Sequence, residues 1–191
     1  MGMGVSSVSS ICKRNDSCSL IEGKSFSAAL TTVHEIGHAL GMFHDEDYEP
    51  LTCDSDKHIM ASAHGRGRTT WSECSAEQLR IHFQNLLRDK RQKNCMQAKR
   101  AEAKPILQLD LKSGLEPGMI YTSERQCHYL LGNSYKPHLE NSFPYNALCE
   151  QLYCSHGFWA VGIHPALPGT LCGHSGNQTY KCDIYGHCVS S

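Results

Sequence analysis

The chain has 191 residues, a formal net charge of −1 and eleven cysteines. This length accommodates one ordinary domain or two small ones. The near balance of charge gives no global field for nucleic acid, and without an apolar run of about eighteen residues no membrane span is predicted.

The first segment, residues 1–24, is polar and rich in glycine and serine, with one strand predicted over residues 5–11. Apolar residues then recur at helical spacing and predict a helix over residues 28–40. Either Ser25 or Ser27 can cap this helix, because serine at that position offers an oxygen to the free amides of the first turn.

Residues 34–45 have the pattern H-E-x-x-H-x-x-G-x-x-H-D, an extended zinc protease signature. Its first part lies on the predicted helix and its second part follows the helix. His34 and His38 lie four residues apart, so their imidazoles share one helix face and can grip one metal ion. Gly41 lets the chain leave the helix, and His44 supplies the third ligand. Glu35 can take a proton from water, and three protein ligands leave a position open for that water.

Charged residues, Pro50 and two glycines predict a loop over residues 45–70. Met60 lies sixteen residues after His44 and fits the methionine turn beneath the histidines of metzincin proteases. An ordinary core methionine is the alternative. His58 is interpreted as a turn residue and not as a fourth ligand.

A second helix is predicted to begin with Ser75 as its N-cap. Its expected buried face consists of Leu79, Phe83, Leu86 and Leu87. The basic run over residues 88–104 allows two interpretations, a patch for sulfated glycans or a solvated helix end. Lys104-Pro105 then marks the end of this basic segment, since proline interrupts regular structure.

Residues 116–191 are dominated by glycine, proline, cysteine and aromatic residues, and their helical periodicity is poor. Such a segment depends on disulfides, since it cannot build a large apolar core. Its aromatic residues offer contacts to a partner or pack locally; they are Phe143, Tyr145, Phe158 and Trp159. Asn15 and Asn177 begin N-x-S/T triplets and are candidate glycosylation sites.

Several stretches together resemble the ADAMTS proteases of the adamalysin (reprolysin) branch of the metzincins, over most of the chain. Besides the histidine motif and Met60, these stretches are Cys12 to Glu22, Ala28 to Thr32, Trp71 to Ser75, Pro117-Gly118, Tyr121 and Gln126-Cys127. The resemblance implies an α+β fold: the C-terminal part of a protease domain, with zinc helix, methionine turn and C-terminal helix, and then a small loop-rich module. We expect a partial catalytic domain over 1–96, a linker over 97–115 and a disintegrin-like, cysteine-rich module over 116–191.

The family's disulfide pattern implies five bridges and leaves Cys18 as a free thiol. The implied pairs are Cys12–Cys95, Cys53–Cys74, Cys127–Cys154, Cys149–Cys182 and Cys172–Cys188. The family's acidic calcium ligand would follow the position of Cys95, where this chain has Met96-Gln97-Ala98. The resemblance therefore does not support a calcium site.

By resemblance, the chain is expected to be a secreted zinc metalloendopeptidase that hydrolyses extracellular matrix proteins. A rival hypothesis is a catalytically incompetent zinc-binding fragment that acts as an interaction module. Residues 1–8 do not resemble a signal peptide, since they have no basic start and no long apolar core. Only thirty-three residues precede His34, fewer than the family places there, so we expect a piece of a longer secreted precursor or a truncated gene model.

Overall fold

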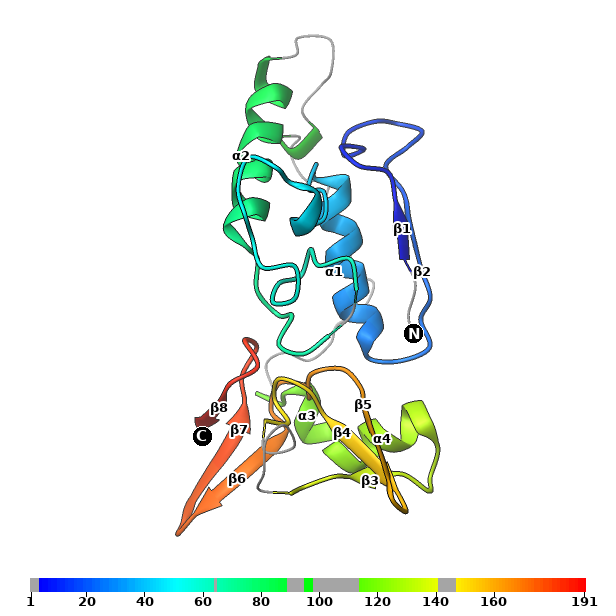
Figure 1. Cartoon of the computed structure of the whole chain (residues 1–191), viewed down its shortest axis with the longest axis vertical. Helices are drawn as coiled ribbons and strands as arrows, with labels where there is room; N and C mark the ends of the chain where they lie inside the picture. Colours follow the sequence, from blue (N-terminus) through cyan, green and yellow to red (C-terminus); the bar gives the residue numbers. More distant parts are fainter. Residues whose placement is uncertain (1–3, 64, 89–94, 98–113, 141–146) are drawn as a thin grey trace.

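The computed structural model describes residues 4–63, 65–88, 95–97, 114–140 and 147–191. The N-terminal part lies at one end of the long axis and the cysteine-rich part at the other (Figure 1). Most of the expected linker, most of the basic run, Phe143 and Tyr145 lie outside the described residues. Mixed helix and sheet with many disulfides agrees with the predicted α+β class.

Helix α1 (Ser27–Ala39) closely follows the prediction, and the antiparallel strands β1 (Gly4–Ser6) and β2 (Ser19–Ile21) pack beside it. The predicted serine cap is wrong, because the N-cap is Phe26 and no side chain described here caps the helix. The strand predicted over residues 5–11 ends early, since Ser9 has a φ of 56°. The chain turns there so that the amides of Ser9 and Ile11 donate to the last carbonyls of α1.

Helix α2 (Glu73–Arg88) begins before the predicted cap at Ser75. Instead, the hydroxyl of Ser72 accepts a 2.9 Å hydrogen bond from the amide of Ser75, three residues later, as an N-cap does. Of the predicted apolar face, Leu86 is buried, whereas Leu87 is 62% exposed and was wrongly assigned to the core. Two single 3-10 turns, η1 (Asp45–Asp47) and η2 (Cys95–Gln97), complete this part.

The cysteine-rich part holds more regular structure than its poor periodicity predicted. Two short helices come first, α3 (Pro117–Ile120) and α4 (Ser123–Leu131). One antiparallel sheet follows with β3 (Lys136–Pro137), β4 (Tyr153–His156) and β5 (Trp159–Gly162). A second consists of β6 (Leu171–Ser175), β7 (Gln178–Cys182) and β8 (Cys188–Ser190).

Cysteines supply much of the core of this part, as its composition predicted. The buried cluster consists of Cys127, Leu148, Cys149, Leu152, Cys154, Ala166 and Cys182. Because four of these seven residues are half-cystines, covalent bonds replace the apolar volume that a short chain lacks.

The structure contains five disulfides, and they join the same pairs that the resemblance implies. They are Cys12–Cys95, Cys53–Cys74, Cys127–Cys154, Cys149–Cys182 and Cys172–Cys188. Cys18 is an exposed free cysteine. Among the helices that the structure describes, none is long and apolar enough to cross a membrane.

Candidate metal centre

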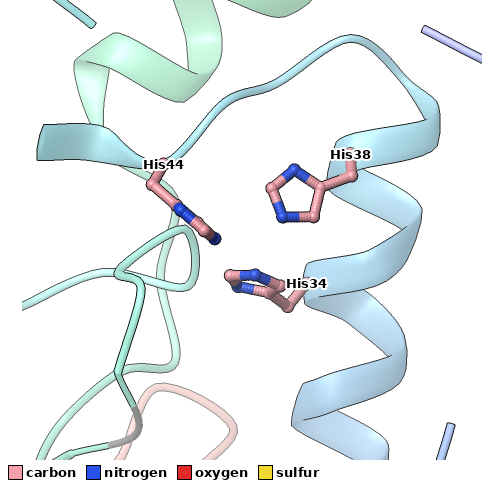
Figure 2. A group of neighbouring side chains, drawn as sticks. All are labelled: His34, His38 and His44. Atoms are coloured by element: carbon pink, nitrogen blue, oxygen red, sulfur yellow. The ribbon is translucent and has the colours of Figure 1, made fainter. Parts of the chain in front are cut away.

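Three histidines converge at the end of helix α1. His34 and His38 project from the helix and His44 faces them from the chain that turns back after it (Figure 2). The ring centroids lie 4.7 Å apart for His34 and His38, 5.2 Å for His34 and His44, and 4.8 Å for His38 and His44. One ligand atom from each ring lies within 4.8 Å of the others, and all three side chains are partly exposed.

Backbone carbonyls orient two of these rings. His34 Nδ1 lies 2.7 Å from the carbonyl oxygen of Ile59, and His38 Nδ1 lies 2.8 Å from that of Met42. Since a carbonyl can only accept, each Nδ1 donates a proton when the imidazole is neutral, and the lone pair is then on Nε2. Metal-binding histidines commonly donate their other ring nitrogen to a carbonyl in this way, so the donor set fits a zinc ion.

Glu35 lies between two of the histidines in sequence and is 4% exposed. Its Oε2 is buried and has no hydrogen-bond partner among the described residues. Strand β1 passes so close that a Cβ on Gly4 would collide with Oε1 and would lie 2.7 Å from Cγ. The carboxylate therefore fits only because residue 4 has no side chain.

The turn that carries Met60 packs against helix α1. Met60 is fully buried, and a Cβ on Gly37 would lie 2.5 Å from its sulfur. The Met60 carbonyl also accepts a 3.0 Å hydrogen bond from the amide of Asp45, the neighbour of His44. The Asp45 carboxylate in turn accepts a 2.5 Å hydrogen bond from the Ser72 hydroxyl at the start of α2. Helix, turn and third histidine thus form one packed unit.

Gly41 directs the chain from the helix to His44. Its φ of +95° is a conformation that residues with a side chain rarely adopt. A Cβ there would also lie 2.8 Å from the ring of His82 on α2. Burial lowers the pKa of His82, with a smaller effect from the charge of Lys13. His82 therefore stays neutral near pH 7 and packs against the turn.

Three contributors to the site were not predicted from the sequence: Gly4, Gly37 and the carbonyl of Ile59. The two glycines matter through close approach of another segment, and no pattern in the sequence marks such an approach. A backbone carbonyl carries no signal in the residue type at all.

Other candidate residues are not members of the histidine cluster. His58 Nδ1 lies 3.2 Å from the Thr70 hydroxyl, within the loop that follows the turn. Asn15 and Asn177 are both exposed, as a glycosylation site must be. Phe158 and Trp159 are strongly exposed on the β4–β5 hairpin. A further sulfur cluster of Cys149, Cys172 and Cys182 consists of disulfide-bonded atoms and is therefore no thiolate metal site.

The fold and the histidine cluster define a metalloproteinase-like chain, and comparison with known families identifies the family. The model of the reprolysin (M12B) family of zinc metalloproteases matches residues 1–99, and that of the ADAMTS cysteine-rich domain 2 matches residues 117–189. The chain belongs to the reprolysin (M12B) family of zinc metalloproteases.

Several curated proteins are similar to this chain. The chain is 31% identical to "A disintegrin and metalloproteinase with thrombospondin motifs adt-1" of Caenorhabditis elegans, over 93% of this chain and 12% of that protein. It is 33% identical to "A disintegrin and metalloproteinase with thrombospondin motifs 8" of Homo sapiens, over 89% of this chain and 20% of that protein. It is 29% identical to "A disintegrin and metalloproteinase with thrombospondin motifs 1" of Homo sapiens, over 98% of this chain and 18% of that protein. The chain thus spans between 12% and 20% of the length of these relatives.

Proposed function

We propose that His34, His38 and His44 hold one catalytic zinc ion and that the chain hydrolyses peptide bonds as a metalloendopeptidase. The observation that carries this proposal is the convergence of three partly exposed imidazoles, two of which have their Nδ1 atoms on backbone carbonyls. Three protein ligands in a site open to solvent are typical of catalytic zinc, whereas structural zinc is closed by four.

The described residues divide the chemistry between them. When held by His34, His38 and His44, zinc would act as a Lewis acid that polarises the peptide carbonyl and lowers the pKa of water. Glu35 accepts the proton of the attacking water and returns it to the leaving nitrogen. Its Oε2 suits this role because no described residue occupies it with a hydrogen bond. The buried Met60 turn packs against helix α1 at Gly37 and so supports the histidines. This is the role proposed for Met60 from the sequence.

The substrates that we propose are proteins of the extracellular matrix, and the proposed location is outside the cell. Family membership supports both, as do the five disulfides, because such bonds persist in oxidising compartments. Binding of sulfated glycans by the basic run over residues 88–104 remains a proposal on sequence alone. Calcium has no part in the proposed mechanism.

Cleavage of a generic fluorogenic peptide, measured with zinc and with Glu35→Gln as the comparison, tests the proposal. Glu35→Gln keeps the shape of the side chain and removes the base, so zinc binding is retained and hydrolysis is lost. Since general base catalysis contributes roughly 100- to 10,000-fold, a loss of at least about 100-fold in kcat is expected. Equal turnover of the two proteins would contradict the role of Glu35.

The same assay separates the proposed enzyme from a binding module. An interaction module would bind zinc stoichiometrically and show no turnover that depends on Glu35. The assay is therefore run on this chain and on a longer protein that contains it.

A further inference from the structure

The loop over residues 65–70 lies between the metal centre and the cysteine-rich part and bonds to both. Toward the cysteine-rich part it donates three hydrogen bonds. Arg66 Nε donates to the Glu150 carboxylate at 2.5 Å, the Gly67 amide to the Glu150 carbonyl at 3.0 Å, and the Thr69 hydroxyl to the Tyr185 carbonyl at 2.8 Å. The loop is thus held at several points by the second part of the chain.

The two acceptors belong to one rigid unit. Glu150 directly follows Cys149, and Tyr185 lies in the turn that begins after Cys182. The Cys149–Cys182 disulfide joins the two positions covalently. Within the turn, Asp183 Oδ1 accepts the amide of Tyr185 at 2.8 Å. We call Glu150 and the Tyr185 carbonyl the acceptor pair; the disulfide fixes its spacing.

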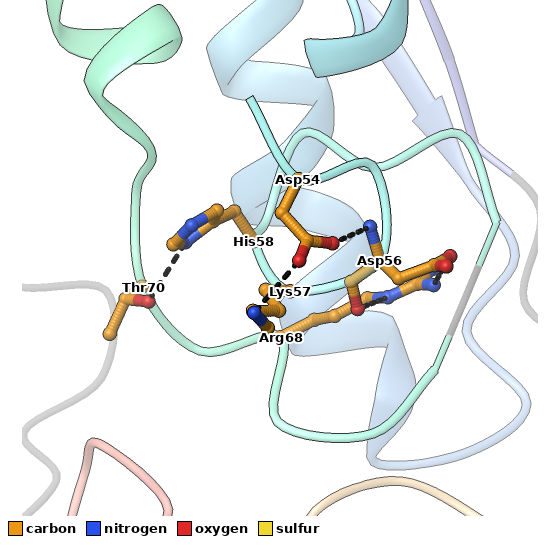
Figure 3. A network of polar contacts seen from close by, with 6 residues as sticks. All are labelled: Asp54, Asp56, Lys57, His58, Arg68 and Thr70. Carbon is orange, nitrogen blue, oxygen red and sulfur yellow. Dashed lines mark hydrogen bonds and ion pairs between the residues drawn. The ribbon is translucent and has the colours of Figure 1, made fainter. Parts of the chain in front are cut away.

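The other end of the loop reaches the metal centre. The Thr70 carbonyl accepts a 2.9 Å hydrogen bond from the Ile59 amide, and the Thr70 hydroxyl contacts His58 (Figure 3). Arg68 also donates to the carbonyl and carboxylate of Asp56 at 3.0 and 3.2 Å. The carbonyl of Ile59 in turn orients the ring of His34. A continuous series of contacts therefore runs from the acceptor pair to a proposed zinc ligand.

We propose that the cysteine-rich part positions His34 by clamping this loop, with Arg66 and Thr69 as the positioning residues. The inference rests on the proposed metal site and goes beyond it, since it assigns the second part of the chain a role in assembling that site. Residues 65–70 are only partly buried. Their conformation is therefore not fixed by a core, and the hydrogen bonds restrict it instead.

The test uses the double variant Arg66→Met with Thr69→Val, which removes both side-chain donors and keeps side chains of similar size. The matched control is Lys57→Gln in the neighbouring segment. The Lys57 side chain is 73% exposed and pairs with Asp54 at 2.8 Å (Figure 3), and it takes no part in the hydrogen bonds that Arg66 and Thr69 donate. Each protein is first compared by thermal unfolding, so that loss of fold is separated from loss of positioning.

The first readout needs no metal. Hydrogen exchange at the Ile59 amide in the zinc-free protein should speed up about tenfold in the double variant and remain unchanged in Lys57→Gln, because opening of the loop exposes this amide. Unchanged exchange in a folded double variant would overturn the inference. This outcome is independent of whether zinc binds or catalysis occurs.

The second readout is zinc affinity, measured by competition with a chromophoric chelator. Mutation of a residue that hydrogen-bonds directly to a zinc ligand typically costs 10- to 100-fold in affinity, so loss of these more distant contacts should raise the zinc Kd roughly three- to tenfold. Exchanging the charges, with Arg66→Glu and Glu150→Arg together, should restore much of the affinity that Arg66→Glu alone loses. Equal zinc Kd values in parent and double variant would contradict positioning, whereas no zinc binding by the parent would contradict the proposed function itself.

Discussion

A methyl group at residue 4 should disable Glu35 without touching a zinc ligand. In Gly4→Ala, the new Cβ would collide with Glu35 Oε1 and lie 2.7 and 2.8 Å from Cγ and Cδ. Glu35 is 4% exposed and packed, so the carboxylate or strand β1 must shift. Overpacking of this kind costs about 1–3 kcal/mol of stability. A displaced base should lower kcat about 100-fold, which corresponds to about 2.7 kcal/mol of barrier.

The assay for Gly4→Ala compares kcat, KM and zinc Kd with those of the parent. Gly23→Ala is the matched control, because a Cβ there meets no described atom within 4 Å. We expect kcat to fall in Gly4→Ala while the zinc Kd stays within about twofold, since no ligand moves. A folded Gly4→Ala protein with parental kcat would refute the argument that Gly4 makes room for the base.

Three further predictions follow from single groups. Alkylation without prior reduction, followed by mass spectrometry, should label the exposed Cys18, and stoichiometric labelling of another cysteine would contradict the pairing. Zinc affinity should fall as the pH drops below about 6.5, where free histidine protonates; a pH-independent Kd would speak against imidazole ligands. Burial lowers the pKa of His164, against a smaller opposing effect of its hydrogen bond to the Pro165 carbonyl. Below about pH 6.5 the unfolded chain therefore binds this proton first, so stability should decline as pH falls, and less steeply in His164→Phe.

Helices were predictable from the sequence because their apolar spacing is a local property. Helix α1 lies within one residue of the predicted range at each end. Its N-cap was not predictable, because the hydroxyls of Ser25 and Ser27 hydrogen-bond each other at 2.5 Å and do not cap the helix. The cap of α2 was misplaced by three residues, since Ser72 and Ser75 both suit the position by residue type and both hydroxyls donate to Asp45.

The strands of the cysteine-rich part could not be read from the sequence, because each has only two to five residues. Such lengths are too short for an alternating pattern to stand out. The histidine cluster, in contrast, follows from helical spacing and one turn at Gly41. The residues around it do not: Gly4 and the Ile59 carbonyl are brought to the site by tertiary packing, which leaves no trace in local residue order.

The most direct test of the central claim is the zinc content of the purified protein, determined by mass spectrometry of the metal after dialysis against a weak chelator. The account predicts one zinc ion per chain in the parent and in Glu35→Gln, and substantially less than one in His34→Ala, His38→Ala and His44→Ala. Full zinc stoichiometry in His44→Ala, or none in the parent, would contradict the claim that these three histidines form a metal centre.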